Sequence, residues 1–135
     1  MVAYSFAPRF ADAVARGIKR QTVRGPRRRH ARAGEPVQLY AGMRTKQCRK
    51  LVAADPIVRE VRHIEIAIDR GLPWVIAGIS IDGVPLDDYS IERFAAADGF
   101  AGGPMSARRE MGLFWLAAHP GVEHFEGVVI HWGDA

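Results

Sequence analysis

The sequence has one cysteine, Cys48, among its 135 residues. A single thiol cannot form an internal disulfide, nor supply the several thiolates of a structural zinc site. No apolar run approaches the roughly 18 to 20 residues that a membrane-spanning helix needs. Residues 1–5 lack the basic region and apolar stretch of a signal peptide. We therefore expect a cytoplasmic protein with no membrane partner.

Motifs for bound cofactors and metals are also missing. The sequence has no Walker-type phosphate loop, no Gly-x-Gly-x-x-Gly after a strand and no Gly-x-Ser-x-Gly elbow. The tightest spacing among its five histidines joins His119 to His124, across the turn-forming pair Pro120-Gly121. That spacing does not place both rings on one helical face, where paired metal ligands are found. The sequence therefore predicts no cofactor and no metal site.

What is present is a globular pattern of moderate length. A hydrophobic fraction of 48% over 135 residues predicts one folded domain spanning residues 1–135. Apolar periodicity and turn residues predict helices at 8–16, 87–97 and 104–119, and strands at 18–24, 37–40, 57–66, 74–81 and 125–132. Asp82-Gly83 is a strong hairpin signal. We expect an α+β fold around a small, mostly antiparallel sheet or barrel.

Negative charge is scarce in one part of the chain. Residues 16–50 contain twelve basic residues and one acid, Glu35, whereas residues 51–135 contain six basic and thirteen acidic residues. Sixteen of the nineteen cations are arginine, which suits bidentate contacts to phosphate. A GC-rich genome would favour arginine but would not cluster it. This asymmetry predicts one strongly positive face.

Two basic segments, 25–32 and 43–50, flank the predicted strand 37–40. Such an arrangement forms a groove that follows a phosphate backbone, and an aromatic residue beside it can stack on a base. We predict nucleic-acid contacts from Arg24, Arg27, Arg28, Arg29, Arg32, Tyr40, Arg44, Lys46 and Arg49. The alternatives are a solvated run of charge and a surface that meets a protein or acidic polymer without specificity.

A second pattern, Lys19-x-x-Thr22-x-Arg24, has a possible chemical use. If this stretch is extended, Thr22 and Arg24 share one face. A threonine hydroxyl becomes nucleophilic when a base lies within hydrogen-bond reach, and neighbouring arginines favour the neutral, basic form of a lysine. The alternative is a β-branched strand residue beside solvated cations.

Several motifs occur in a familiar order. They are Gly17-x-Lys19-x-x-Thr22-x-Arg24 after a helix, Gly34 before Val37–Tyr40, Gly42–Lys46, Ile81–Leu86, Phe94-Ala95-x-x-Asp98-Gly99-Phe100 and the closing Phe125–Trp132. In order and spacing the chain resembles the ASCH domain family, small β-barrels related to PUA and YTH modules, over nearly its whole length. Gly42–Lys46 looks like bacterial and phage members.

The resemblance implies a PUA-like barrel whose cleft, flanked by helices, holds RNA or a nucleotide. Small bacterial members include an amidohydrolase that deacetylates N4-acetylcytidine, and a metal-assisted ribonuclease has been described. In the amidohydrolase a Lys, a Thr and a later Glu act together. Lys19 and Thr22 match the first two, and Asp98 stands where that enzyme has Glu. Asp is one methylene shorter, which puts that substrate in question.

From this resemblance we expect an RNA- or nucleotide-binding domain with Lys19, Thr22, Arg24 and Asp98 in its cleft. We also expect Lys19 to face Asp98 across the cleft. The alternative is a hydrolase acting on a modified nucleoside or on RNA, with Thr22 as nucleophile, Lys19 as its base and Asp98 as a positioning group. The partner is then RNA, single-stranded nucleic acid or a modified nucleoside, and no oligomeric state is predicted.

Overall fold

The computed structural model describes residues 1–133. Its elements are, in chain order, β1 (Val2–Phe6), α1 (Pro8–Ala15), β2 (Gln21–Arg24), β3 (Val37–Ala41), β4 (Arg49–Lys50), β5 (Val58–Ile68), β6 (Ile76–Ile81), β7 (Val84–Pro85), α2 (Asp88–Ala95), the π-helical turn η1 (Ala96–Phe100), α3 (Ala107–Ala118) and β8 (His124–Trp132). No helix within residues 1–133 is long and apolar enough to cross a membrane.

The α+β class is confirmed, and the three helices form close to their predicted positions. The Asp82-Gly83 turn is also confirmed, because Ile81 pairs with Val84 across it. Both turn residues have positive φ, 50° and 81°, as the tight turn of a two-residue hairpin requires. Strand β1, which we did not predict, is the main addition.

The strands form two sheets, with the orders β1-β3-β4 and β2-β8-β5-β6-β7. The larger sheet is antiparallel, whereas the smaller is mixed because β1 runs parallel to β3, with Val2 opposite Val37. A parallel pair needs a long crossover, and residues 7–36, which include α1, provide it. Within residues 1–133 the pairing closes no barrel, so the barrel stays a prediction.

The chain divides into two compact units. Unit 1 comprises residues 1–22, 27–61 and 130–135, and unit 2 comprises residues 23–26 and 62–129. Strands β2, β5 and β8 contribute residues to both units. The single ASCH-like domain therefore stays a prediction.

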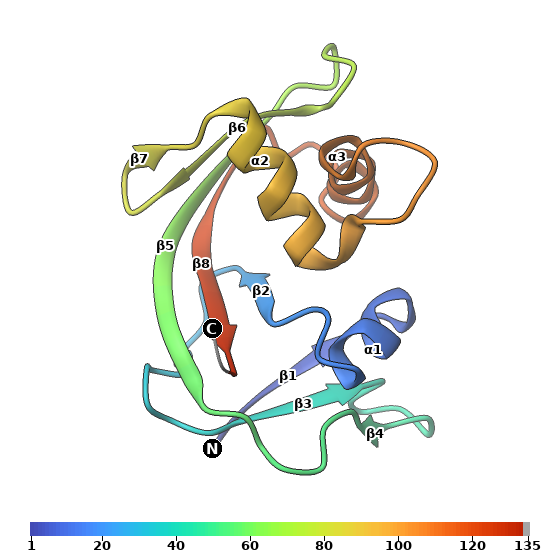
Figure 1. Ribbon diagram of the computed structural model, residues 1–135, viewed down its shortest axis with the longest axis vertical. Coiled ribbons are helices and arrows are strands. Elements are labelled where there is room, and N and C mark those ends of the chain that lie inside the picture. Colours follow the sequence, from blue (N-terminus) through green and yellow to red (C-terminus); the bar gives the residue numbers. More distant parts are fainter. Residues whose placement is uncertain (134–135) are drawn as a thin grey trace. The chain divides into compact units, whose positions relative to one another are not determined.

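Unit 1 is built on the β1–β3 pair. Both strands alternate buried and half-buried residues, so that one face of each lies in the core. Helix α1 lies beside this pair (Figure 1) and buries Phe10 and Val14. Helix α1 ends at Ala15 and is followed by Gly17, whose φ of 74° is one that glycine adopts without strain. The N–H groups of Ile18 and Lys19 both bond to the carbonyl of Ala13, which fixes the start of the following segment.

Unit 2 combines the β5–β6 hairpin with α2 and α3. The Asp87 carboxylate caps α2 by accepting a 2.7 Å hydrogen bond from the N–H of Ser90, which lowers the pKa of Asp87. Glu92 of α2 accepts bonds of 2.8 and 2.9 Å from the N–H groups of Ala107 and Arg108, at the start of α3. These bonds satisfy free donors at the helix start and tie the two helices together.

Candidate nucleic-acid interface

The first basic segment is an ordered loop, residues 27–34, which we call the arginine loop. Its anchor is Tyr4 of β1, which is 1% exposed. The Tyr4 hydroxyl accepts a 3.2 Å bond from the N–H of Ala31 and shares a 2.9 Å bond with Nδ1 of His30. The guanidinium of Arg27 lies 5.1 Å from the centre of the Tyr4 ring and donates to the carbonyl of Ala3. A buried aromatic side chain therefore fixes an exposed cationic loop.

Glu35 closes the arginine loop. Its carboxylate accepts a 2.7 Å bond from the N–H of Arg32 and forms an ion pair with Arg29. The Arg32 bond, helped by Arg29, lowers the pKa of Glu35. This one acid offsets Arg29, whereas Arg28 and Arg32 remain exposed to solvent. Residues 28–33 and Val61 surround an open depression of about 440 Å³.

The second basic segment is also ordered. We call residues 42–50 the second loop. Thr45 donates a 2.6 Å bond from its hydroxyl to the carbonyl of Gly42, and the same hydroxyl accepts from the N–H of Gln47. Lys50 forms a 2.8 Å ion pair with Asp55, which raises the pKa of Lys50. The side chains of Arg44, Lys46 and Arg49 are exposed.

Both loops belong to unit 1 and join opposite ends of β3. This strand has five residues, so the loops are separated by roughly 16 Å at about 3.3 Å per residue. Tyr40 lies on β3 opposite Lys50 of β4 and is half-buried. Arg24 belongs to unit 2. The structure thus collects the predicted basic residues other than Arg24 in one unit.

The two units differ in sign of charge. Unit 1 contains thirteen basic and five acidic residues, a formal charge of +8, and unit 2 contains six basic and ten acidic residues, a formal charge of −4. The predicted charge asymmetry therefore coincides with the division into units. A surface of one sign attracts polyanions and accelerates their association.

The residues predicted for chemistry are buried. Lys19, Thr22 and Asp98 are 3%, 4% and 6% exposed. The ammonium of Lys19 lies 5.0 Å from the centre of the Phe10 ring and 5.9 Å from that of Phe6. These distances are within the range of a cation–π contact.

Asp98 occupies the π-helical turn η1, next to Gly99, which has a φ of 107°. This left-handed backbone favours glycine and interrupts the helical geometry inside η1. Asp98 belongs to unit 2, whereas Lys19 and Thr22 belong to unit 1. That Asp98 faces Lys19 across a cleft stays a prediction.

Two residues of this region were not predicted from the sequence. Gln21 is 6% exposed and lies between the buried Lys19 and Thr22, next to the exposed Arg20. Tyr4 was missed because β1 was not predicted, although Val2-Ala3-Tyr4-Ser5-Phe6 alternates large apolar residues with small ones.

Nothing in residues 1–133 groups three or more His, Cys, Asp or Glu side chains in a way that would hold a metal ion. Cys48 is exposed in the second loop. Comparison with known proteins finds no match: no family model fits the chain, and no curated protein or solved structure is significantly similar to it.

Proposed function

We propose that this protein binds single-stranded RNA, or a nucleotide derived from it, through the exposed cations of unit 1. The observation that carries the proposal is the concentration of exposed arginine and lysine in two ordered loops that join the ends of β3. An RNA strand presents phosphates along its length, and arginine binds them with paired hydrogen bonds.

The loops are held by bonds that leave much of their charge at the surface. Tyr4 and Glu35 fix the arginine loop, and Thr45 fixes the second loop. A fixed loop loses less conformational entropy when a ligand binds, so ordered cations favour binding. Tyr40, on the strand between the loops, is suited to stack on an unpaired base.

The ASCH-like, PUA-like barrel fold is part of this proposal. Its support is the α+β class, the order of the motifs along the chain and the burial of Lys19, Thr22 and Asp98, the three residues that the resemblance singles out. An experimental structure with bound oligonucleotide would test the barrel and its cleft together.

A second candidate, hydrolysis of an acylated nucleoside, is favoured by the same burial. Among residues 1–133 the buried polar side chains are Lys19, Gln21, Thr22, Asp98 and Arg108. Lys19, Gln21 and Thr22 enclose an amine and a hydroxyl within one short segment, and these are the two groups that the reaction needs.

In this reaction the Thr22 hydroxyl attacks the acyl carbon while Lys19, in its neutral form, takes the proton. Collapse of the tetrahedral intermediate breaks the bond to the nucleoside amine, which receives a proton from Lys19, and water then cleaves the acyl-threonine ester. Asp98 positions the substrate amide or the lysine.

Binding is tested by fluorescence anisotropy with a labelled single-stranded RNA, competed by duplex RNA, single-stranded DNA and heparin. The proposal predicts that unlabelled single-stranded RNA displaces the probe at lower concentration than duplex RNA of equal length. Equal displacement by heparin and RNA at equal charge would instead indicate a surface that binds any acidic polymer.

Hydrolysis is tested by incubating the protein with N4-acetylcytidine and with short RNA, and by reading deacetylation and cleavage by mass spectrometry. The wild-type protein is compared with Lys19→Ala, Thr22→Ala and Asp98→Glu over a range of pH. Activity abolished by Thr22→Ala supports the hydrolase. If neither the wild type nor Asp98→Glu shows turnover, the hydrolase is excluded for this substrate.

A further inference from the structure

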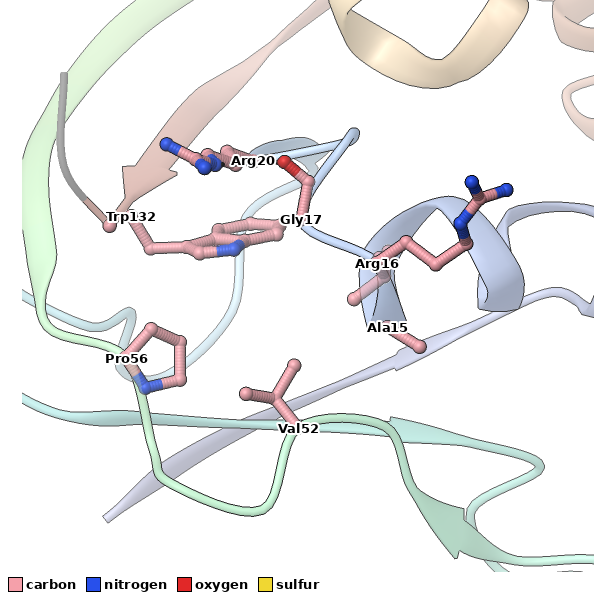
Figure 2. A pocket seen from close by; sticks show the side chains of 9 residues that line it. Ala15, Arg16, Gly17, Arg20, Val52, Pro56 and Trp132 are labelled. Atoms are coloured by element: carbon pink, nitrogen blue, oxygen red, sulfur yellow. Dashed lines mark hydrogen bonds between the residues drawn. The ribbon is translucent and has the colours of Figure 1, made fainter.

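A second hollow in unit 1 lies apart from the two basic loops. Its volume is about 330 Å³, and it is formed by the end of α1, residues 52–56 and the end of β8. Figure 2 shows Val52, Pro56 and the indole of Trp132 around it, with Arg20 beside the indole. The guanidinium of Arg16 points away from Trp132 in the same view.

Backbone hydrogen bonds hold the walls of this hollow. The N–H of Trp132 donates to the carbonyl of Arg20 at 3.1 Å, and the N–H of Gly133 donates to the carbonyl of Ile57 at 3.1 Å. Nε of Arg20 donates to the carbonyl of Gly17 at 2.8 Å, which sets the direction of its side chain. The hollow is therefore formed before any ligand arrives, as ligand pockets usually are.

The charge at the rim favours an anion. The described residues that line the hollow include two arginines and no acid, and one of these arginines, Arg16, forms a 3.4 Å ion pair with Asp12 outside the hollow. The end of a helix carries partial negative charge, which opposes an anion. Here the carbonyls of Ala13 and Val14 already accept bonds from the N–H groups of Ile18, Lys19 and Gly17, so much of that charge is neutralised. The positive charge of Arg20 then makes the rim of the hollow favourable for an anion.

The floor favours a flat apolar ring. Val52 and Pro56 are half-buried and offer aliphatic surface, whereas Val14 and Trp132 also line the hollow but are only 1% and 4% exposed. A volume of about 330 Å³ is at the lower end of the range for ligand pockets and accommodates one nucleotide, but not a stack of bases. A ring with an anionic group attached matches the floor and the rim together.

We propose that this hollow binds a single nucleotide with a terminal phosphate, its base against Pro56 and Val52 and its phosphate at Arg20. The inference rests on the proposed function, which makes nucleotides the natural ligands. The same chemistry is presented by a free nucleoside monophosphate and by the phosphorylated end of an RNA strand. In the second case the hollow selects the end of the strand while the two loops bind its length.

Isothermal titration with AMP, CMP and adenosine tests the hollow directly. AMP or CMP is expected to bind the wild type saturably, and adenosine more weakly by about tenfold or more, since a hydrogen bond to a charged group contributes about 1.5–3 kcal/mol. Arg20→Gln is expected to remove this preference for the phosphate. Arg16→Gln is the matched control: it removes the same charge from the same rim, and is expected to change affinity less than about twofold.

A second variant tests the hollow without changing its charge. Ala15 is exposed and lines the hollow, so Ala15→Trp is expected to fill it and abolish nucleotide binding while the circular dichroism spectrum stays unchanged. Absence of AMP and CMP binding to the wild type overturns the inference. Equal reductions in Arg20→Gln and Arg16→Gln overturn it too, because they indicate unspecific charge.

Paired oligoribonucleotides with and without a 5′ phosphate distinguish the two sources of the ligand. Tighter binding of the phosphorylated strand, abolished in Ala15→Trp, assigns the hollow to strand ends. Mononucleotide binding without that preference assigns it to free nucleotides. A third outcome is RNA binding that is unchanged in Arg20→Gln and Ala15→Trp, together with no mononucleotide binding. This outcome overturns the inference about the hollow but supports the proposed function. Mononucleotide binding without RNA binding supports the hollow and overturns RNA binding by the two loops.

Discussion

Arginine has different roles in the two units. In unit 1 the arginines of the arginine loop are exposed, and one of them, Arg29, forms an ion pair with Glu35. In unit 2 Arg108 is 8% exposed and donates bonds of 2.9 and 2.7 Å to the carbonyl of Ile76 and one of 2.9 Å to Asp88. The buried Arg108 connects a helix of unit 2 to its sheet, whereas the arginines of the arginine loop lie at the surface of unit 1.

The positive charge is distributed unevenly between the two units. Unit 2 has a formal charge of −4, so the positive excess is confined to unit 1. Unit 1 has a formal charge of +8, and crowding like charges opposes a compact state. The excess in unit 1 is what supports the proposal of a polyanionic ligand.

The largest expected effect comes from removing the buried arginine. Arg108→Met leaves the carbonyl of Ile76 without its two charged donors, which costs about 2–3 kcal/mol of unfolding free energy. The matched change Arg28→Met, at an exposed position of the arginine loop, should cost less than about 0.5 kcal/mol. Urea denaturation of the two variants measures both. Equal destabilisation would contradict the division of roles.

Close packing in unit 2 gives the next effect. A Cβ at Gly112 of α3 would lie 2.5 Å from Cβ of Val75 and 2.9 Å from the carbonyl of Trp74. Gly112→Ala should therefore cost about 1–3 kcal/mol through overpacking, although alanine favours a helix. Gly78→Ala is the control in the same unit, because a Cβ there meets nothing within 4 Å. Thermal melting that shows equal stability for both would contradict the packing of α3.

A smaller effect is expected at acidic pH in unit 1. The pKa of Glu35 is lowered by the N–H of Arg32 and by Arg29, so folding favours the ionised carboxylate. Its contribution is present above the ordinary pKa of 4.5 and disappears as the pH falls through the lower pKa of the folded state. Glu35→Gln should flatten the dependence of the urea midpoint on pH below that value. An unchanged dependence would mean that Glu35 does not hold the arginine loop.

The smallest effect is expected near neutral pH in unit 2. Burial lowers the pKa of His119, whose ring stacks on Trp115 at 4.2 Å between centroids. The folded state favours neutral His119, so stability is full above the ordinary pKa of 6.5 and falls as the pH drops through the lower pKa of the folded state. His119→Gln should reduce this slope between about pH 5 and 7. An equal slope in the variant would assign the pH dependence to other groups.

Local patterns in the sequence were enough to predict the helices, the Asp82-Gly83 hairpin and the exposed basic segments. Strand β1 was missed although it is as long as β3, because its parallel partner follows only after a long crossover. The two roles of arginine could not be predicted either. Arg108 and Arg28 both stand beside other arginines in the sequence, and only the carbonyl of Ile76, distant along the chain, distinguishes them.

The burial of Lys19 and Thr22 could not be predicted from the local sequence either. Lys19 and Thr22 are equally compatible with a solvated strand, and their low exposure depends on packing with side chains such as Phe10. The order of motifs singled them out, but it could not tell whether they would be exposed or enclosed.

The most direct test of the central claim is the salt dependence of single-stranded RNA binding. The triple variant Arg27→Ala, Arg28→Ala, Arg29→Ala removes three exposed cations from unit 1, and the variant Arg62→Ala, Arg70→Ala, Arg93→Ala removes three from unit 2. We predict that the unit 1 variant flattens the slope of log K against log salt by about one for each phosphate that it no longer binds, while the unit 2 variant keeps the wild-type slope. Equal slopes in the two variants would contradict the claim that unit 1 binds the RNA.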